Sequence, residues 1–209
     1  MGRYNDALKW LYDHHFKSWE GRYGIHQYWV ESHIRQGDIE FETGNYEKAL
    51  EHYRLSLEYP QNLEVAAQPR TIHARKHYKV AVALEALGRK KEAREMLRKV
   101  VADQLALDNA YQYYKGKALE KLGKKEEARK VYEQLLAAVN NRAESMSEQE
   151  EMSHYFDPGR NPQALLHFKR SLALEGLGQK QQAEAERQKA IELDPIVALR
   201  AFSPPRAGW

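Results

Sequence analysis

Gly44-Asn-Tyr-Glu-Lys-Ala49 is the first of four copies of one phrase, which begins with glycine and has an alanine five residues later. The other copies are Gly88-Arg-Lys-Lys-Glu-Ala93, Gly123-Lys-Lys-Glu-Glu-Ala128 and Gly178-Gln-Lys-Gln-Gln-Ala183. Each copy stands between two runs whose apolar residues recur at helical spacing. The phrase therefore predicts an array of helical hairpins, in which each hairpin buries its apolar face against the next one.

The composition of the phrase has a physical explanation. Glycine ends the first helix because it adopts the left-handed conformation at little steric cost. The alanine is expected on the packed side of the second helix, where a small side chain lets two backbones approach closely. A larger residue follows one turn later on the same face. These larger residues are Tyr53, Leu97 and Tyr132, and only the fourth copy departs from the pattern, with Arg187.

On these residues the chain resembles the tetratricopeptide repeat (TPR) proteins, whose period is about 34 residues. The closing proline of the family pattern is present as Pro195 and, one position early, as Pro60. The resemblance covers residues 30–62, 74–106, 109–140 and 164–196. It implies an all-α, right-handed solenoid of about four hairpins, preceded by half a repeat.

The spacing of the glycines locates the irregular parts of the array. Successive glycines are 44, 35 and 55 residues apart, so the extra residues lie after the first and third repeats. We expect a single array over residues 1–209. Its expected parts are a half-repeat with an aromatic linker (2–25), four repeats (26–62, 74–106, 109–140 and 164–196), an inserted loop (141–163) and a tail (197–209).

Both ends of the sequence contain pieces of the same pattern. Gly2-Arg-Tyr-Asn-Asp-Ala7, followed by Leu11, matches the second half of a repeat, and Ile196-Val-Ala-Leu-Arg-Ala-Phe202 resembles the start of another helix. Two explanations of the N-terminal piece stay open. Either it is an ordinary capping helix, or the chain is part of a longer array or a multidomain protein.

Composition narrows the possible classes of function. Hydrophobic residues make up 42% of the chain and charged residues 30%, so the sequence can form a core with a well-solvated surface. There is no cysteine, which fits a reducing compartment, and we expect the protein to be cytoplasmic. No apolar run approaches the length of a membrane span. The net charge of +3 is mixed with many acidic residues, so neither nucleic acid nor a membrane is an expected partner.

The resemblance implies that the first helices of successive repeats line a concave groove, which would bind a peptide, a partner protein or another domain of the same polypeptide. A column of groove positions would hold Ile34, Tyr78, Tyr113 and Phe168, and we expect the rings of Tyr113 and Phe168 to face solvent. The predicted binding residues are Arg35, Asp38, Arg75, Tyr78, Lys79, Tyr113, Tyr114, Lys117, Phe168 and Lys169. Rings supply contact area and cations can hold carboxylates. In the alternative, the rings pack between helices or onto the inserted loops.

Neither a metal, a cofactor nor catalysis is expected. His33, His77 and His167 occupy the same repeat position, which favours a recurring structural role over a metal site. The chain contains no glycine-rich phosphate loop, no HExxH motif and no Gly-x-Ser-x-Gly motif. An alternative from the enzyme class is a hydrolase or metal site on the long loop, formed by His154, Asp157 and His167.

A finer resemblance suggests a second function. Trp19-Glu-Gly-Arg-Tyr-Gly24, Tyr59-Pro-Gln-Asn-Leu63 and Phe156-Asp-Pro-Gly-Arg-Asn-Pro162 are similar to the TPR region that follows a β-sandwich of unassigned function in large bacterial proteins. This similarity implies an accessory region of a carbohydrate-active protein, packed against its own catalytic or sugar-binding domain.

Overall fold

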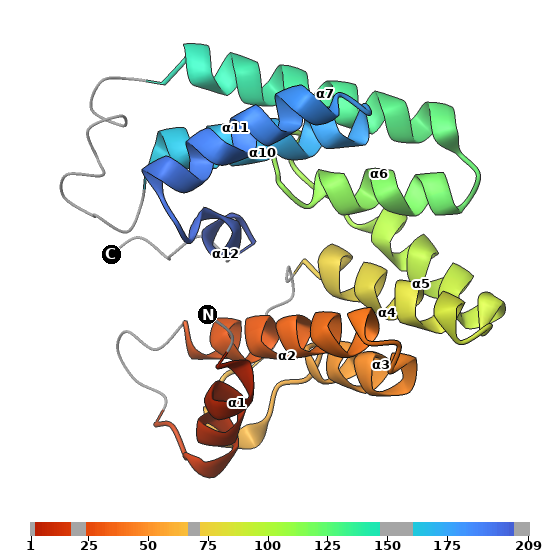
Figure 1. The fold of residues 1–209 in the computed structure, drawn as a ribbon, viewed down its shortest axis with the longest axis vertical. Coiled ribbons are helices and arrows are strands. Elements are labelled where there is room, and N and C mark those ends of the chain that lie inside the picture. The colour runs from red at the N-terminus through yellow and green to blue at the C-terminus, as the bar shows by residue number, and fades with distance from the viewer. Residues whose placement is uncertain (1–2, 18–23, 67–71, 147–160, 203–209) are drawn as a thin grey trace. The chain divides into compact units, whose positions relative to one another are not determined.

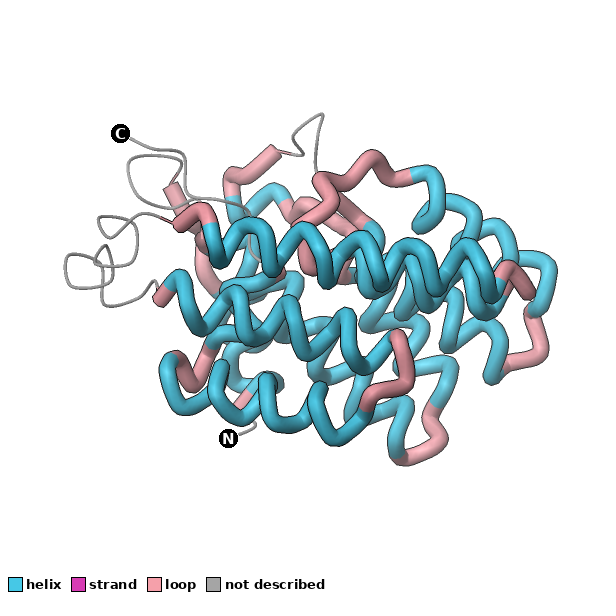
Figure 2. The backbone as a smooth tube through the Cα atoms, turned by 90° about the horizontal axis from the view of Figure 1, so that it is seen from above, coloured by secondary structure: helices cyan, strands magenta, loops and turns pink. Residues whose placement is uncertain are grey.

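The computed structural model describes residues 3–17, 24–66, 72–146 and 161–202, and within these ranges the chain forms helices joined by turns and loops, without a strand (Figures 1 and 2). The all-α class predicted from the sequence is confirmed. The described residues divide into two compact units. Unit 1 ends at Asp103 and unit 2 begins at Gln104.

Unit 1 consists of an N-terminal helix and two helical hairpins. Its elements are α1 (Tyr4–Asp13), α2 (Ile25–Glu42), α3 (Tyr46–Leu55), the 3-10 turn η1 (Gln61–Leu63), α4 (Ala74–Ala86) and α5 (Lys90–Ala102). Helices that follow one another in the chain pack together, α2 on α3, α3 on α4 and α4 on α5. This sequential packing is typical of an array whose repeats contact only their neighbours.

Unit 2 is built from two further hairpins and a short C-terminal helix. Its elements are α6 (Gln112–Lys121), α7 (Lys125–Glu144), α10 (Pro162–Gly176), α11 (Lys180–Leu193) and α12 (Val197–Ala201). Helix α10 packs on α7, α11 and α12, and also contacts α6. Helix α7 continues to Glu144, so the first residues of the predicted loop at 141–163 are helical. Most of that loop, including His154 and Asp157, lies outside the described residues, and the predicted repeat boundaries stay predictions.

The turn inside each hairpin has the same geometry in all four copies. Gly44, Gly88, Gly123 and Gly178 have φ angles of 83°, 73°, 83° and 78°. The amide after each glycine donates to a carbonyl in the last turn of the preceding helix, as Asn45 does to Glu40 at 2.8 Å. These are the features of a helix that ends in a left-handed residue. The predicted role of the glycines is therefore confirmed.

The alanines and the larger residues one turn later form the interior of the hairpins. Ala49, Ala93, Ala128 and Ala183 are each at most 3% exposed. Tyr53, Leu97 and Tyr132 are each 1% exposed. Arg187, which replaces the large residue in the fourth repeat, is not buried like the others. Its side chain is one-third exposed and forms an ion pair with Glu175.

Two tyrosine rings determine where glycine is needed within the helices. A Cβ atom on Gly116 would lie 2.2 Å from Cε1 of Tyr132, and one on Gly176 would lie 2.4 Å from the same ring. A Cβ atom on Gly37 would lie 2.6 Å from the ring of Tyr53. Any larger residue would have to displace a buried ring, so glycine permits the close packing of these helices.

The N-terminal helix closes the end of unit 1. Leu11 of α1 is buried in a cluster with Trp29, Ile34 and Leu63, and the indole of Trp29 donates a 2.8 Å hydrogen bond to the carbonyl of Leu55. Ile34 is 0% exposed. It therefore presents no surface to a groove, contrary to the expectation for this position.

Candidate functional site

The predicted binding residues of unit 1 lie on α2 and α4, the first helices of its two hairpins. Asp38 of α2 forms a 2.6 Å ion pair with Lys79 of α4 and accepts a 2.7 Å hydrogen bond from the hydroxyl of Tyr53. Burial, with the neighbouring charge of Asp38, raises the pKa of Tyr53, so the hydroxyl stays protonated and can donate. This group of side chains connects α2, α3 and α4.

A second ion pair joins the same two helices and is buried. Glu31 and Arg75 are 7% and 5% exposed, and Nη2 of Arg75 donates to Oε2 of Glu31 at 3.2 Å. Nε of Arg35 lies 3.9 Å from the same carboxylate. Tyr78, one turn along α4 from Arg75, is half-buried. Arg75 can hold the carboxylate of a partner only if this pair is broken, which leaves Glu31 buried without its main counter-charge.

The polar candidates of unit 2 also have acidic partners within their own unit. The hydroxyl of Tyr113 donates a 2.5 Å hydrogen bond to Glu175 of α10. The remaining contacts are Lys117 with Glu120 at 2.9 Å and Lys169 with Asp108 at 3.2 Å. The faces that carry these residues therefore present charges that are already paired.

An aromatic cluster covers part of the first-helix face of unit 2. Phe202 directly follows α12. Its ring centroid lies 5.2 Å from the ring centroid of Tyr111, 5.5 Å from that of Tyr114 and 6.0 Å from that of Phe168. Phe168 is consequently only 7% exposed. The expectation that its ring faces solvent is wrong, because the residues that follow α11 turn back and cover it.

The structure brings some predicted residues together and leaves others apart. Asp38 meets Lys79, and Tyr114 and Phe168 meet around Phe202. Tyr78 belongs to unit 1, whereas Tyr113 and Phe168 belong to unit 2, so one continuous column of rings stays a prediction. The sequence did not identify several residues that contact the predicted ones, which are Glu31, Asp108, Tyr111, Glu120, Glu175 and Phe202. Only Phe202 carried a signal, as the aromatic end of a helix-like segment.

Burial favours the neutral state of three histidines in unit 1, His33, His73 and His77. Nδ1 of His33 lies 3.0 Å from Nδ1 of His52, and burial, with the nearby His52, lowers the pKa of His33 to about 3. Burial also lowers the pKa of His73 and of His77 to about 4. The 1% exposure of His33 supports its predicted structural role. Among the described residues, no group of three or more potential metal ligands is present.

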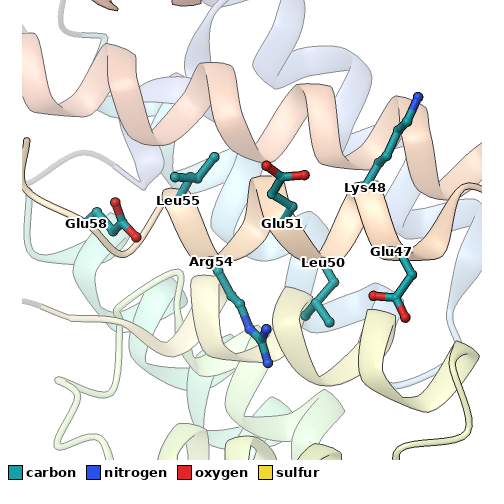
Figure 3. A pocket seen from close by; sticks show the side chains of 7 residues that line it. All are labelled: Glu47, Lys48, Leu50, Glu51, Arg54, Leu55 and Glu58. Carbon is teal, nitrogen blue, oxygen red and sulfur yellow. The ribbon is translucent and has the colours of Figure 1, made fainter.

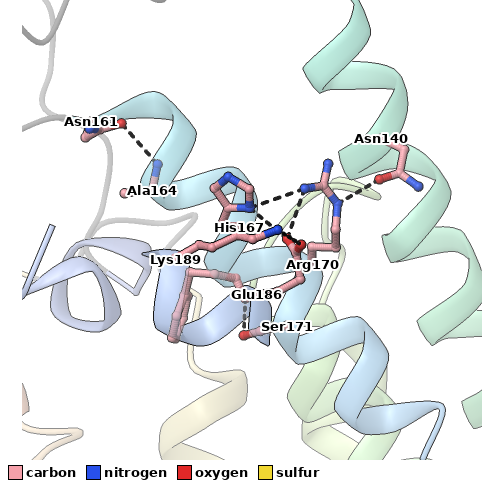
Figure 4. A network of polar contacts seen from close by, with 9 residues as sticks. Asn140, Asn161, Ala164, His167, Arg170, Ser171, Glu186 and Lys189 are labelled. Carbon is pink, nitrogen blue, oxygen red and sulfur yellow. Dashed lines mark hydrogen bonds and ion pairs between the residues drawn. The ribbon is translucent and has the colours of Figure 1, made fainter. Parts of the chain in front are cut away.

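His167, the third histidine at this repeat position, belongs to a polar network between α7, α10 and α11 (Figure 4). Its Nδ1 atom lies 2.7 Å from Glu186, which also pairs with Arg170 at 3.1 Å, and Arg170 donates to Asn140 at 2.9 Å. The hydrogen bonds to His167 and Arg170 lower the pKa of Glu186 against the effect of burial. The network connects three helices. The proposed partners of His167 in a hydrolase site, His154 and Asp157, lie outside the described residues.

A depression on α3 offers little chemistry of its own (Figure 3). Its lining comes from α3 and the turn that follows, and consists of Glu47, Lys48, Leu50, Glu51, Arg54, Leu55 and Glu58. Three carboxylates and two cations alternate along one exposed surface, which is typical of a solvated helix face. None of the predicted binding residues contributes to it.

The comparison with protein-family models agrees with the fold described above. Family models described as tetratricopeptide repeat match residues 30–62, 78–143 and 164–196, which together make up more than half of the chain. Among solved structures, the chain is similar to a crystal structure of MamA, with 19% sequence identity over 81% of this chain and 80% of that chain and a TM-score of 0.32. A comparison with curated proteins gave no match.

The chain belongs to the tetratricopeptide repeat family. The four glycine turns and the buried alanines are the features of this family that the sequence and the structure share. Repeats of this kind form protein-interaction and scaffolding modules in general. Among the described residues, no helix is both long enough and apolar enough to cross a membrane.

Proposed function

We propose that this chain is a non-catalytic module that binds a peptide or a partner domain through the first-helix faces of its hairpins. In unit 1 the face comprises Arg35, Asp38, Arg75, Tyr78 and Lys79. In unit 2 it comprises Tyr113, Tyr114, Lys117, Phe168 and Lys169. A partner on a separate chain and a partner domain of the same polypeptide are both included, because both would need the same faces.

The observation that carries the proposal is the cluster around Phe202. A side chain from outside the four hairpins lies between Tyr111, Tyr114 and Phe168, and it is only 6% exposed. The face formed by α6 and α10 can therefore bury an aromatic residue from another segment. Aromatic residues in such packed positions commonly dominate the energetics of protein interfaces.

The charges on these faces also favour binding over catalysis. The carboxylates of Asp38 and Glu175 are engaged by the cations of Lys79 and Arg187. General acid–base catalysis needs groups whose pKa values are matched to a proton transfer. Paired charges instead supply specificity, because a partner must provide groups that replace the existing ones.

The proposal is tested with two single substitutions on the first-helix faces. A partner is first captured by the immobilised protein and identified by mass spectrometry, and its affinity is then measured by calorimetry. Tyr78→Ala and Lys117→Ala should each change this affinity if their face is used, and loss of an interface tyrosine should weaken binding by about tenfold or more. Both side chains are only partly buried, so the helices should remain folded.

Tyr46→Ala and Arg94→Ala are the matched controls, because these side chains are exposed on the second helices α3 and α5. They should leave the affinity unchanged. If the control substitutions weaken binding while Tyr78→Ala and Lys117→Ala do not, the partner uses the second-helix surface, and the proposal fails.

A further inference from the structure

We infer that α12 and Phe202 act as an internal occupant of the binding face of unit 2, and that a partner binds there by displacing them with a helical segment of the same chemistry. The inference rests on the proposed function and specifies it further. It assigns one binding position, the ring site between Tyr111, Tyr114 and Phe168, and it identifies a contact that keeps this position closed.

The contacts of α12 are those of a bound helical peptide. Val197 and Phe202 are 1% and 6% exposed, and Ala198 and Ala201 pack against the same cluster. The hydroxyl of Tyr111 donates a 2.7 Å hydrogen bond to the carbonyl of Phe202. An apolar anchor, a closely packed small side chain and a polar contact to the backbone are therefore combined within six residues.

The position of α12 differs from that of a further repeat. Leu57 and Leu136 stand eight residues after the alanine of their repeats, and both pack against the apolar core of their unit. Ile191 stands at the same position of the fourth repeat, yet it is 43% exposed. Helix α12 therefore does not cover Ile191 near the end of α11. It packs on α10 instead, where Phe202 contacts Tyr111 and Tyr114 at the start of α6.

These contacts define the chemistry of the partner. It should present a short helix with an aliphatic residue five positions before an aromatic one, as Val197 precedes Phe202. Residues as small as Ala198 and Ala201 are needed on the packed side, because the helix lies close to α10. An aromatic end is required, since the surrounding rings of Tyr111, Tyr114 and Phe168 meet it edge-on or tilted.

Displacement is feasible because α12 is short. It has five residues, and a helix of that length has little stability apart from its packing. Helix α12 nonetheless competes well with a free partner, because a tethered segment acts at an effective concentration in the millimolar range. A free partner must overcome this advantage, so its apparent affinity falls by the fraction of molecules whose site is open.

The test uses a synthetic peptide of residues 194–202, labelled with fluorescein, and the full chain. Fluorescence anisotropy is measured with the wild type, with Phe202→Ala and with Phe202→Leu, which keeps most of the apolar volume. The peptide should bind Phe202→Ala on the order of 10- to 100-fold more tightly than the wild type, with Phe202→Leu in between. Adding Tyr114→Ala should remove the gain, and a peptide with alanine in place of its phenylalanine should not bind. Circular dichroism confirms that each variant is helical.

Ile196→Ala is the control variant, because Ile196 lies next to α12 and is 49% exposed. It should bind the peptide as weakly as the wild type does. Equal binding by the wild type and both Phe202 variants would show that the peptide uses another site, and the inference would fail. No binding by folded Phe202→Leu and Phe202→Ala would equally overturn it. In either case the proposed function stands or falls separately, on the partner affinities of Tyr78→Ala and Lys117→Ala.

Discussion

His33 and His52 share a hydrogen bond between their Nδ1 atoms, so one neutral ring donates and the other accepts. The environment of His33 explains why neutrality is favoured. Its ring packs 4.3 Å from that of Trp29, and the side chain is almost completely buried. A proton on His33 would place a charge in an apolar site and a second donor opposite His52.

The histidine pair predicts that unit 1 is destabilised by mild acid. The pKa of His33 is about 3 in the folded protein and 6.5 in the unfolded chain. Below pH 6.5 the unfolded chain therefore binds the extra proton, and stability falls as the pH decreases towards 3. We expect His33 to account for a loss on the order of 1 to 2 kcal/mol at pH 5. Urea unfolding followed by circular dichroism from pH 7.5 to 4.5 measures this loss.

The variant His33→Gln isolates this contribution. It should be less stable than the wild type at pH 7.5, because the contact with His52 is altered, but its stability should depend less steeply on pH. The comparison is His15→Gln, which removes an imidazole that is 66% exposed instead of a buried one. An unchanged pH dependence in His33→Gln would assign the acid sensitivity to other groups.

At the scale of the element, Asn161 is the clearest single determinant of a helix end. Its side chain accepts a 3.1 Å hydrogen bond from the amide of Ala164, and Pro162 occupies the first turn of α10. Asn161→Ala should lower the free energy of unfolding by about 1 kcal/mol. Chemical denaturation of the purified variant measures this change.

Asn45 provides the matched comparison for Asn161. It precedes α3 in the same way, but its side chain makes no cap hydrogen bond and contacts Glu40 and Thr43 instead. Asn45→Ala should therefore cost less than Asn161→Ala. Equal losses in the two variants would mean that the cap at α10 contributes nothing specific.

The hairpins could be predicted from the sequence because their signals are local. Gly44 and Ala49 lie within six residues, and the left-handed conformation of Gly44 and the burial of Ala49 both follow from this short local pattern. The place of Phe202 could not be predicted in this way. Its contact with Tyr111 joins residues that are 91 positions apart, and no repeat register relates them. The partners of Arg75 and Tyr113 were missed for the same reason.

At the scale of the whole molecule, each unit has its own tyrosine packed against glycine. Tyr53 covers Gly37 in unit 1, and Tyr132 covers Gly116 in unit 2. Forcing a methyl group into such a contact lowers the free energy of unfolding by about 1–3 kcal/mol. In a repeat array each hairpin is stabilised only by the hairpins next to it. The destabilising effect of each substitution should therefore be largest within its own unit.

Hydrogen-exchange mass spectrometry tests this expectation. Gly116→Ala should accelerate amide exchange in α6, α7 and α10 more than in α2 to α5, and Gly37→Ala should show the reverse. Gly24→Ala is the control, because the nearest atom to its added Cβ is 4.0 Å away. Uniform acceleration along the chain in both variants would mean that the two units unfold as one block.

The tether between α11 and Phe202 has a kinetic consequence. If a partner can enter only after the aromatic ring has left, the observed rate of capture rises with partner concentration and then levels off at the rate of opening. Stopped-flow traces would then report a property of this chain that is the same for every partner. The opening rate of a five-residue helix would then limit how fast the module exchanges partners.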